Sequence, residues 1–130
     1  MSNLETVKAA YAAFAHNDPS VLFGAMDPAI RWYQAEGNPL ADRNPYFGAQ
    51  AIGDDVFGRL LAAIDDFTVV PETYIDGGDD VVTLGRYGGV MKAGGAKLNA
   101  QFCHVWRFSG GKIATFQQFT DTTQWARLMG

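Results

Sequence analysis

The sequence of 130 residues has one cysteine and no cluster of positive charge. Cys103 can form no intrachain disulfide and has no metal-ligand pattern around it, so neither a disulfide scaffold nor a zinc site is expected. Ten lysine and arginine residues are scattered along the chain, and the net charge is −4. Because nucleic acids and anionic membranes are bound through clustered positive charge, neither is predicted as a partner.

Long apolar runs and cofactor motifs are also missing. No segment approaches the roughly 20 apolar residues of a transmembrane helix. The sequence contains no phosphate-binding loop, nucleophile elbow, paired-histidine metal motif or calcium loop. We therefore expect no cofactor and no metal site, and a cytoplasmic location by default.

Aromatic and apolar residues, in contrast, are abundant, at 13% and 48% of the chain. A chain of this length buries roughly two thirds of its unfolded surface, so residues 1–130 are predicted to form one domain. The aromatic content exceeds what a minimal core requires, and these rings must pack together or line a cavity.

The first part of the chain is predicted to be helical. Ser2 and Glu5 have the spacing of a capping box, and the apolar residues that follow recur at three- and four-residue steps, which indicates an amphipathic helix. Asp18 is expected to cap a second, short helix with Pro19 at its first position and an apolar set that reaches Met26.

The rest of the chain changes from helix to sheet. A brief strand at 30–33 and a loop at 36–48 precede a third helix at 52–64, and a short C-terminal helix follows residue 121. The period becomes two in four predicted strands, at 67–75, 81–91, 98–108 and 113–120, with glycine-rich turns between them. This order predicts an α+β fold in which a curved antiparallel sheet wraps around the N-terminal helices as a cone, with a ligand pocket at its mouth.

The strand at 98–108 carries the leading candidate for chemistry. One face consists of Leu98, Phe102, His104, Trp106 and Phe108, so His104 is its only ionisable group. An imidazole in apolar surroundings can serve as a general acid or base. The alternative is a core histidine that is hydrogen-bonded to a backbone carbonyl.

Other charged groups near this strand have two interpretations each. Asp121 is either a carboxylate partner of the histidine or the cap of the last helix, and Glu36 is either a pocket group or a solvated loop charge. Arg86 either reaches into the pocket as an anion anchor or lies at the sheet edge, and the second is favoured.

Five segments together resemble the SnoaL-like family of the nuclear transport factor 2-like (NTF2-like) superfamily, which is related to ketosteroid isomerase. These segments are residues 7–18, 30–33, 104–108, 111–113 and 119–122. The resemblance implies a cystatin-like α+β barrel with a hydrophobic cavity and a homodimer formed through the outer sheet face. It also implies candidate activities, since members include isomerases, polyketide cyclases and dehydratases.

The residues that carry catalysis in these relatives are mostly replaced. The positions that match the aspartate base and the protonated aspartate of ketosteroid isomerases hold Trp32 and His104, and the position of their first-helix tyrosine holds Ala10, beside Tyr11. The position that matches the acidic residue of SnoaL-type cyclases holds Gln118.

The leading hypothesis is a small-molecule binding protein with an apolar ligand. An isomerase, cyclase or lyase reaction on an apolar carbonyl compound would use His104 as acid or base, and the ligand would contact Trp32, Tyr11, Phe102, Trp106, Gln118 and Glu36. A non-catalytic ligand carrier and a protein-interaction module of the NTF2-like type are the alternatives.

Overall fold

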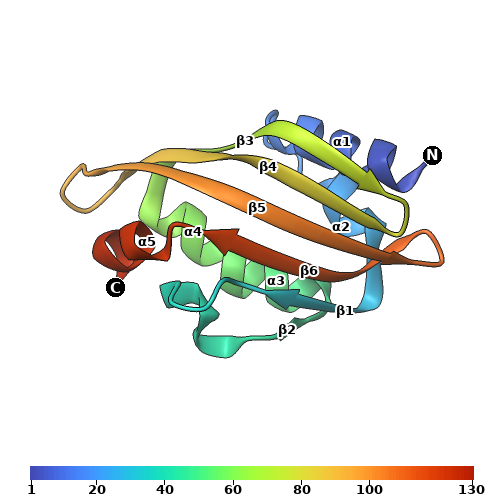
Figure 1. The fold of residues 1–130 in the computed structure, drawn as a ribbon. Helices are drawn as coiled ribbons and strands as arrows, with labels where there is room; N and C mark the ends of the chain where they lie inside the picture. Colours follow the sequence, from blue (N-terminus) through green and yellow to red (C-terminus); the bar gives the residue numbers. More distant parts are fainter.

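The computed structural model describes residues 1–130 as helices on one face of a single curved sheet (Figure 1). The helices are α1 (Asn3–Phe14), α2 (Ser20–Ala25), α3 (Gly48–Ile52), α4 (Gly58–Ala63) and α5 (Thr122–Met129), with a 3₁₀ helix at Pro39–Arg43. The strands are β1 (Met26–Tyr33), β2 (Tyr46–Phe47), β3 (Ile64–Gly77), β4 (Asp80–Met91), β5 (Lys97–Ser109) and β6 (Lys112–Thr120).

The sheet is open, with the strand order β2-β1-β6-β5-β4-β3. Every neighbouring pair is antiparallel except β1 and β6, which run parallel. The predicted α+β class and curved sheet are confirmed, whereas the parallel pair was not predicted. The parallel pair is possible because β1 and β6 lie far apart in the sequence, so no hairpin requires them to be antiparallel.

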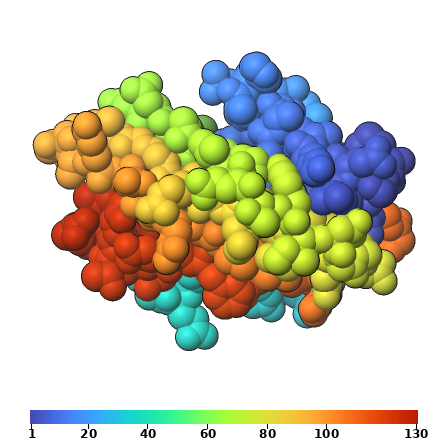
Figure 2. Space-filling model, turned by 45° about the horizontal axis from the view of Figure 1, so that its top comes forward, coloured from blue at the N-terminus to red at the C-terminus, as the bar shows by residue number.

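Helix α1 begins as predicted. The Ser2 hydroxyl accepts a bond from the Glu5 backbone N–H at 3.0 Å, and the Glu5 carboxylate accepts one from the Ser2 N–H at 3.2 Å. Its buried residues, Val7, Ala10 and Tyr11, face the sheet. Figures 1 and 2 both place β3 alongside α1, which covers the strand at the edge of the sheet.

Three predicted helix boundaries are wrong. Pro19 is the N-cap of α2, while Asp18 accepts bonds from the N–H and hydroxyl of Ser20, and Met26 is already the first residue of β1. The residue that ends the third predicted helix, Ile64, begins β3. A buried apolar residue four positions after Leu60 satisfies the helical period as well as the strand period, so spacing alone cannot separate the two.

The third helical segment also begins earlier than predicted, at Gly48, and contains a π-helical turn at Gly53–Phe57 between α3 and α4. The buried side chains of this segment are Ile52, Val56 and Leu60. The segment therefore closes the side of the core that lies opposite the sheet. None of the helices is both long and apolar enough to span a bilayer.

Candidate functional site

His104 lies on the inner face of β5, where only 4% of its surface is exposed. Its imidazole stacks on the ring of Phe102, with 3.9 Å between centroids and 11° between planes. The alternation predicted for this strand is confirmed, since Leu98, Phe102, Trp106 and Phe108 are buried on the same face.

Two tyrosine hydroxyls hold the imidazole. The Tyr11 Oη atom lies 2.6 Å from His104 Nδ1, and the Tyr87 Oη atom lies 2.5 Å from Nε2. A core histidine was expected to bond a backbone carbonyl. In the structure, both imidazole nitrogens bond tyrosine hydroxyls instead. Tyr87 was missed in the sequence, although the period of β4 puts it on the inner face with Val81 and Thr83.

Each of the two hydroxyls also accepts a hydrogen bond from another side chain. The indole N–H of Trp106 donates to Tyr11 Oη at 3.1 Å, and the Gln118 amide Nε2 donates to Tyr87 Oη at 2.8 Å. The Gln118 oxygen accepts bonds from the Ala35 N–H at 3.1 Å and from an Asn38 side chain at 3.2 Å. A backbone N–H can only donate, so this contact settles which end of the Gln118 amide faces Tyr87.

The hydrogens in this network can be counted. Tyr11, His104 and Tyr87 carry one hydrogen each when the imidazole is neutral. The two bonds to His104 use two of these three hydrogens. The third remains on one of the two tyrosine hydroxyls and needs an acceptor other than the histidine.

Thr83 lies next to this network, since it is paired with His104 across β4 and β5 and is fully buried. Its Oγ1 is the one buried side-chain polar atom without a hydrogen bond. The same hydroxyl is close enough to Tyr11 to lower the pKa of that phenol. The Thr83 hydroxyl can thus accept a hydrogen bond from Tyr11.

Burial keeps these groups uncharged. Desolvation lowers the pKa of His104 to about 3. It raises the pKa of Tyr87 and raises the pKa of Tyr11 well above its usual value, although bonds from neighbouring groups oppose both shifts. Near neutral pH, His104 is therefore a neutral imidazole between two neutral phenols.

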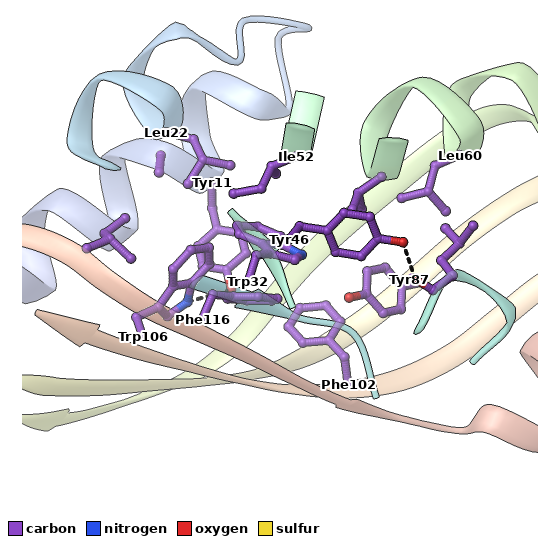
Figure 3. Packing of buried hydrophobic residues seen from close by; sticks show 14 of the residues in the cluster. Tyr11, Leu22, Trp32, Tyr46, Ile52, Leu60, Tyr87, Phe102, Trp106 and Phe116 are labelled. Atoms are coloured by element: carbon purple, nitrogen blue, oxygen red, sulfur yellow. Dashed lines mark hydrogen bonds between the residues drawn. The ribbon is translucent and has the colours of Figure 1, made fainter. Parts of the chain in front are cut away.

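The network borders a narrow cavity of about 50 Å³ between the sheet and the helices. No Asp, Glu, Lys or Arg lines this cavity. Figure 3 shows how the rings of Tyr11, Trp32, Trp106 and Phe116 gather here, and Trp32 stacks on Phe116 with 3.8 Å between centroids. The other lining residues are Ala10, Phe14, Leu22, Gln34, Val56, Phe57, Leu60, Phe67, Val69, Tyr87, His104 and Gln118.

The structure brings together Trp32, Tyr11, Trp106 and Gln118 with His104, as the sequence predicted. Phe102 stacks on the imidazole without lining the cavity, so it supports the site from below.

The charged candidates lie elsewhere. Glu36 is exposed in a surface groove with Tyr33 and Phe119, away from the lining residues of the cavity. Asp121 caps α5 by accepting the Gln124 N–H, and Arg86 is exposed and donates to Asn99 at 3.0 Å. The prediction of Glu36 as a neighbour of His104 fails because the chain leaves the sheet after Tyr33 and turns outward.

Comparison with solved structures supports the fold. An NTF2-like protein from Burkholderia thailandensis is 35% identical, with a TM-score of 0.93 over 100% of this chain and 98% of that one. An NTF2-like protein of unknown function from Burkholderia pseudomallei is 28% identical, with a TM-score of 0.87 over 99% and 98% of the two chains.

A third structure has the same fold at lower identity. The protein TerC, co-crystallised with polyporic acid, is 24% identical, with a TM-score of 0.83 over 97% of this chain and 96% of that one. No curated protein matches the chain at a significant level. The family model described as the SnoaL-like domain matches residues 7–116. With this match along most of the sequence, the chain belongs to the SnoaL-like family, within the NTF2-like superfamily.

Proposed function

We propose that the cavity binds a small apolar molecule with a carbonyl oxygen, and that a tyrosine hydroxyl beside His104 donates a hydrogen bond to this oxygen. The observation that carries the proposal is the surplus hydroxyl hydrogen in a buried, uncharged network at an aromatic cavity wall. A carbonyl oxygen can accept this hydrogen in place of Thr83, and the surrounding rings supply apolar contacts for the rest of the ligand.

The cavity must widen for such a ligand to enter. Its volume of about 50 Å³ is smaller than the roughly 150 Å³ of an engineered cavity that holds benzene. The half-buried rings of Phe14, Phe57 and Phe67 line the cavity and have fewer packing constraints than the buried indoles. We assign the opening movement to these phenylalanines, so the first ligands to test are single six-membered rings.

The same hydrogen bond supports a reaction. When a carbon next to a carbonyl loses a proton, negative charge develops on the oxygen, and a hydrogen bond donated in a desolvated site stabilises this charge. Isomerase, cyclase and lyase reactions share this step. In such a reaction the carbon proton passes to the Tyr11 oxygen, the Tyr11 hydrogen passes to His104 Nδ1, the Nε2 hydrogen passes to Tyr87, and the Tyr87 hydrogen passes to the carbonyl oxygen. His104 thus acts as acid and base in the same step.

A ligand carrier is the second candidate, and Gln118 favours it. Its amide is held by Ala35 and Asn38 and cannot accept a proton near neutral pH. The low pKa of His104 also makes the imidazole a weak base. A carrier would use the same hydrogen bond to hold the carbonyl compound without changing it.

Binding can be tested with benzene and cyclohexanone as probes, followed by amide chemical shifts in two-dimensional NMR. We expect both probes to shift resonances of cavity residues such as Ala10 and Val56, and cyclohexanone to bind more tightly. The advantage of the ketone should fall about tenfold in Tyr87→Phe, which loses one hydroxyl of the network. If neither probe shifts the cavity resonances at millimolar concentration, the proposal is wrong.

The reaction can be tested separately from binding. Transfer of deuterium from D₂O to the carbons beside the carbonyl of bound cyclohexanone requires loss of a proton there. Faster exchange with the wild-type protein than with His104→Phe supports an enzyme, and equal exchange supports a carrier.

A homodimer through the outer sheet face is a further part of this proposal. Leu84, Cys103 and Phe119 are cross-strand neighbours on that face, and 38% of Leu84 and 54% of Phe119 are exposed. A second copy of the chain would bury these apolar side chains.

A further inference from the structure

The Gln34 amide nitrogen is a free donor at the cavity wall. The Gln34 Oε1 atom accepts the indole N–H of Trp32 at 2.9 Å. The Nε2 atom makes no hydrogen bond within the protein and, unlike Thr83 Oγ1, keeps a little accessible surface. Only 3% of the Gln34 surface is exposed, so bulk water does not solvate this amide in full. Two amide hydrogens without protein partners therefore lie beside the cavity.

The Gln34 amide cannot be flipped, that is, its oxygen and nitrogen cannot exchange places. An indole N–H can only donate, so the atom of Gln34 that faces Trp32 must be the oxygen. Trp32 points to the inner face of β1, and the Gln34 side chain must lie on that face to reach it. Gln34 borders the outer groove as well as the cavity, and its backbone is hydrogen-bonded to Asn44.

The cavity wall offers fewer free acceptor positions than free donors. The Gln118 oxygen already accepts two bonds, and the Gln34 oxygen accepts one from Trp32 and keeps one lone pair. Both nitrogens of His104 are bonded to tyrosines. What the wall can give a ligand is the surplus tyrosine hydrogen and the two hydrogens of Gln34.

We propose that Gln34 determines ligand specificity, and that the cavity prefers apolar molecules that bring hydrogen-bond acceptors rather than donors to its polar wall. This inference rests on the proposed small-molecule site. An apolar ring with two carbonyl oxygens, of the dione or quinone class, satisfies the tyrosine hydrogen and the Gln34 amide together. Two alcohol groups in place of the carbonyls bring two hydrogens, for which the wall has one free lone pair, on the Gln34 oxygen. A buried donor without a partner is unfavourable.

A matched pair of probes tests this selection. Cyclohexane-1,4-dione and trans-cyclohexane-1,4-diol have the same six-membered carbon ring. The oxygens of the dione only accept hydrogen bonds, whereas those of the diol also donate them. We expect the dione to bind the wild-type protein about tenfold more tightly than the diol, as measured by NMR titration. Equal affinities, or a tighter diol, would overturn the inference.

Two variants and one control assign the effect to Gln34. Gln34→Glu, studied at pH 8, keeps an oxygen for the Trp32 indole and removes the amide hydrogens, and Gln34→Met removes the polar group altogether. Both should lose the preference for the dione. Gln50→Glu makes the same chemical change as the first variant on the exposed surface of α3 and should keep the preference in full.

The outcomes separate this inference from the proposed function. If benzene and cyclohexanone bind but the preference for the dione survives in both Gln34 variants, the site exists and Gln34 does not select its ligand. If none of the four probes binds the wild-type protein, the proposed function itself fails. Thermal unfolding of each variant checks that a lost preference does not reflect a lost fold.

Discussion

The ring of Phe102 lies against the backbone of Gly85, its partner across β4 and β5. A Cβ atom at residue 85 would be 2.5 Å from the Phe102 Cζ atom and would also collide with the Val70 carbonyl oxygen. The same ring stacks on His104. Glycine at this position therefore allows the phenylalanine to lie flat beneath the imidazole.

Gly85→Ala should consequently lower the free energy of unfolding by about 2–3 kcal/mol, because neither the strand carbonyl nor the stacked ring can move without loss of packing. Urea denaturation measures the change. Gly24→Ala is the matched control, since a Cβ there would meet no atom within 4 Å. In α2 this control should be neutral or stabilising by about 0.5–1 kcal/mol, and similar losses in both variants would contradict the role of Gly85.

The buried His104 should make stability dependent on pH. Its pKa is about 3 in the folded protein and about 6.5 in an unfolded chain. The unfolded state therefore binds more protons as the pH falls below 6.5, and stability decreases from there towards pH 3. Between pH 6 and pH 5 the expected loss is about 1 kcal/mol from this residue.

The measurement is chemical denaturation at several pH values for the wild type and His104→Gln. The wild-type free energy should decrease through this interval, while the variant should start lower and change less. The interval lies above the usual range of carboxylates, so their titration adds little to the difference. Equal slopes for the two proteins would show that the imidazole is not held neutral.

The sequence was sufficient to find His104 because strand alternation depends only on neighbouring residues. The same alternation places Tyr87 on the inner face of β4, but it does not predict the contact of Tyr87 with the imidazole. Tyr87 is paired with Ala100, and its contact with the imidazole is diagonal across two further residue pairs. That contact depends on how far the Tyr87 ring tilts along the strand towards His104. The strand period gives only the face on which a side chain lies.

The failure at Glu36 has a different cause. Residues 36–48 were predicted as one loop, and the structure places a 3₁₀ helix and β2 within them. Side-chain bonds between Asn44 and the Gln34 backbone hold this segment against the end of β1. These contacts join residues ten apart with no periodic pattern, so no sequence pattern indicates that Gln34, rather than Glu36, faces the cavity.

The outer sheet face offers a separate prediction. If Leu84 and Phe119 are covered by a second copy of the chain, Leu84→Glu should place a charge in the interface and convert a dimer into a monomer. Light scattering after size-exclusion chromatography measures the mass. Leu61→Glu is the control, because Leu61 is 52% exposed on α4, which is not part of the sheet. A wild-type protein that is already monomeric would refute the dimer.

The surplus hydrogen of the Tyr11–His104–Tyr87 network should lie on Tyr11 in the free protein. In the free protein Thr83 is the only unpartnered acceptor beside the network, so we expect the Tyr11 hydroxyl to point to it. His104 Nδ1 then donates to Tyr11, and Tyr87 donates to Nε2. Nitrogen-15 chemical shifts of the imidazole distinguish this tautomer from the one protonated at Nε2.

Thr83→Val should shift the imidazole towards the Nε2-protonated tautomer, because the hydrogen on Tyr11 loses its acceptor and is given to Nδ1 instead. Thr83→Ser, which keeps the hydroxyl, should retain the wild-type tautomer. A carbonyl ligand that accepts a bond from Tyr87 should have the same effect as the valine variant, since it draws the surplus hydrogen to the opposite end of the network. An imidazole whose tautomer is the same in all four samples would mean that Thr83 takes no part, and that the hydrogens of the network do not respond to the ligand.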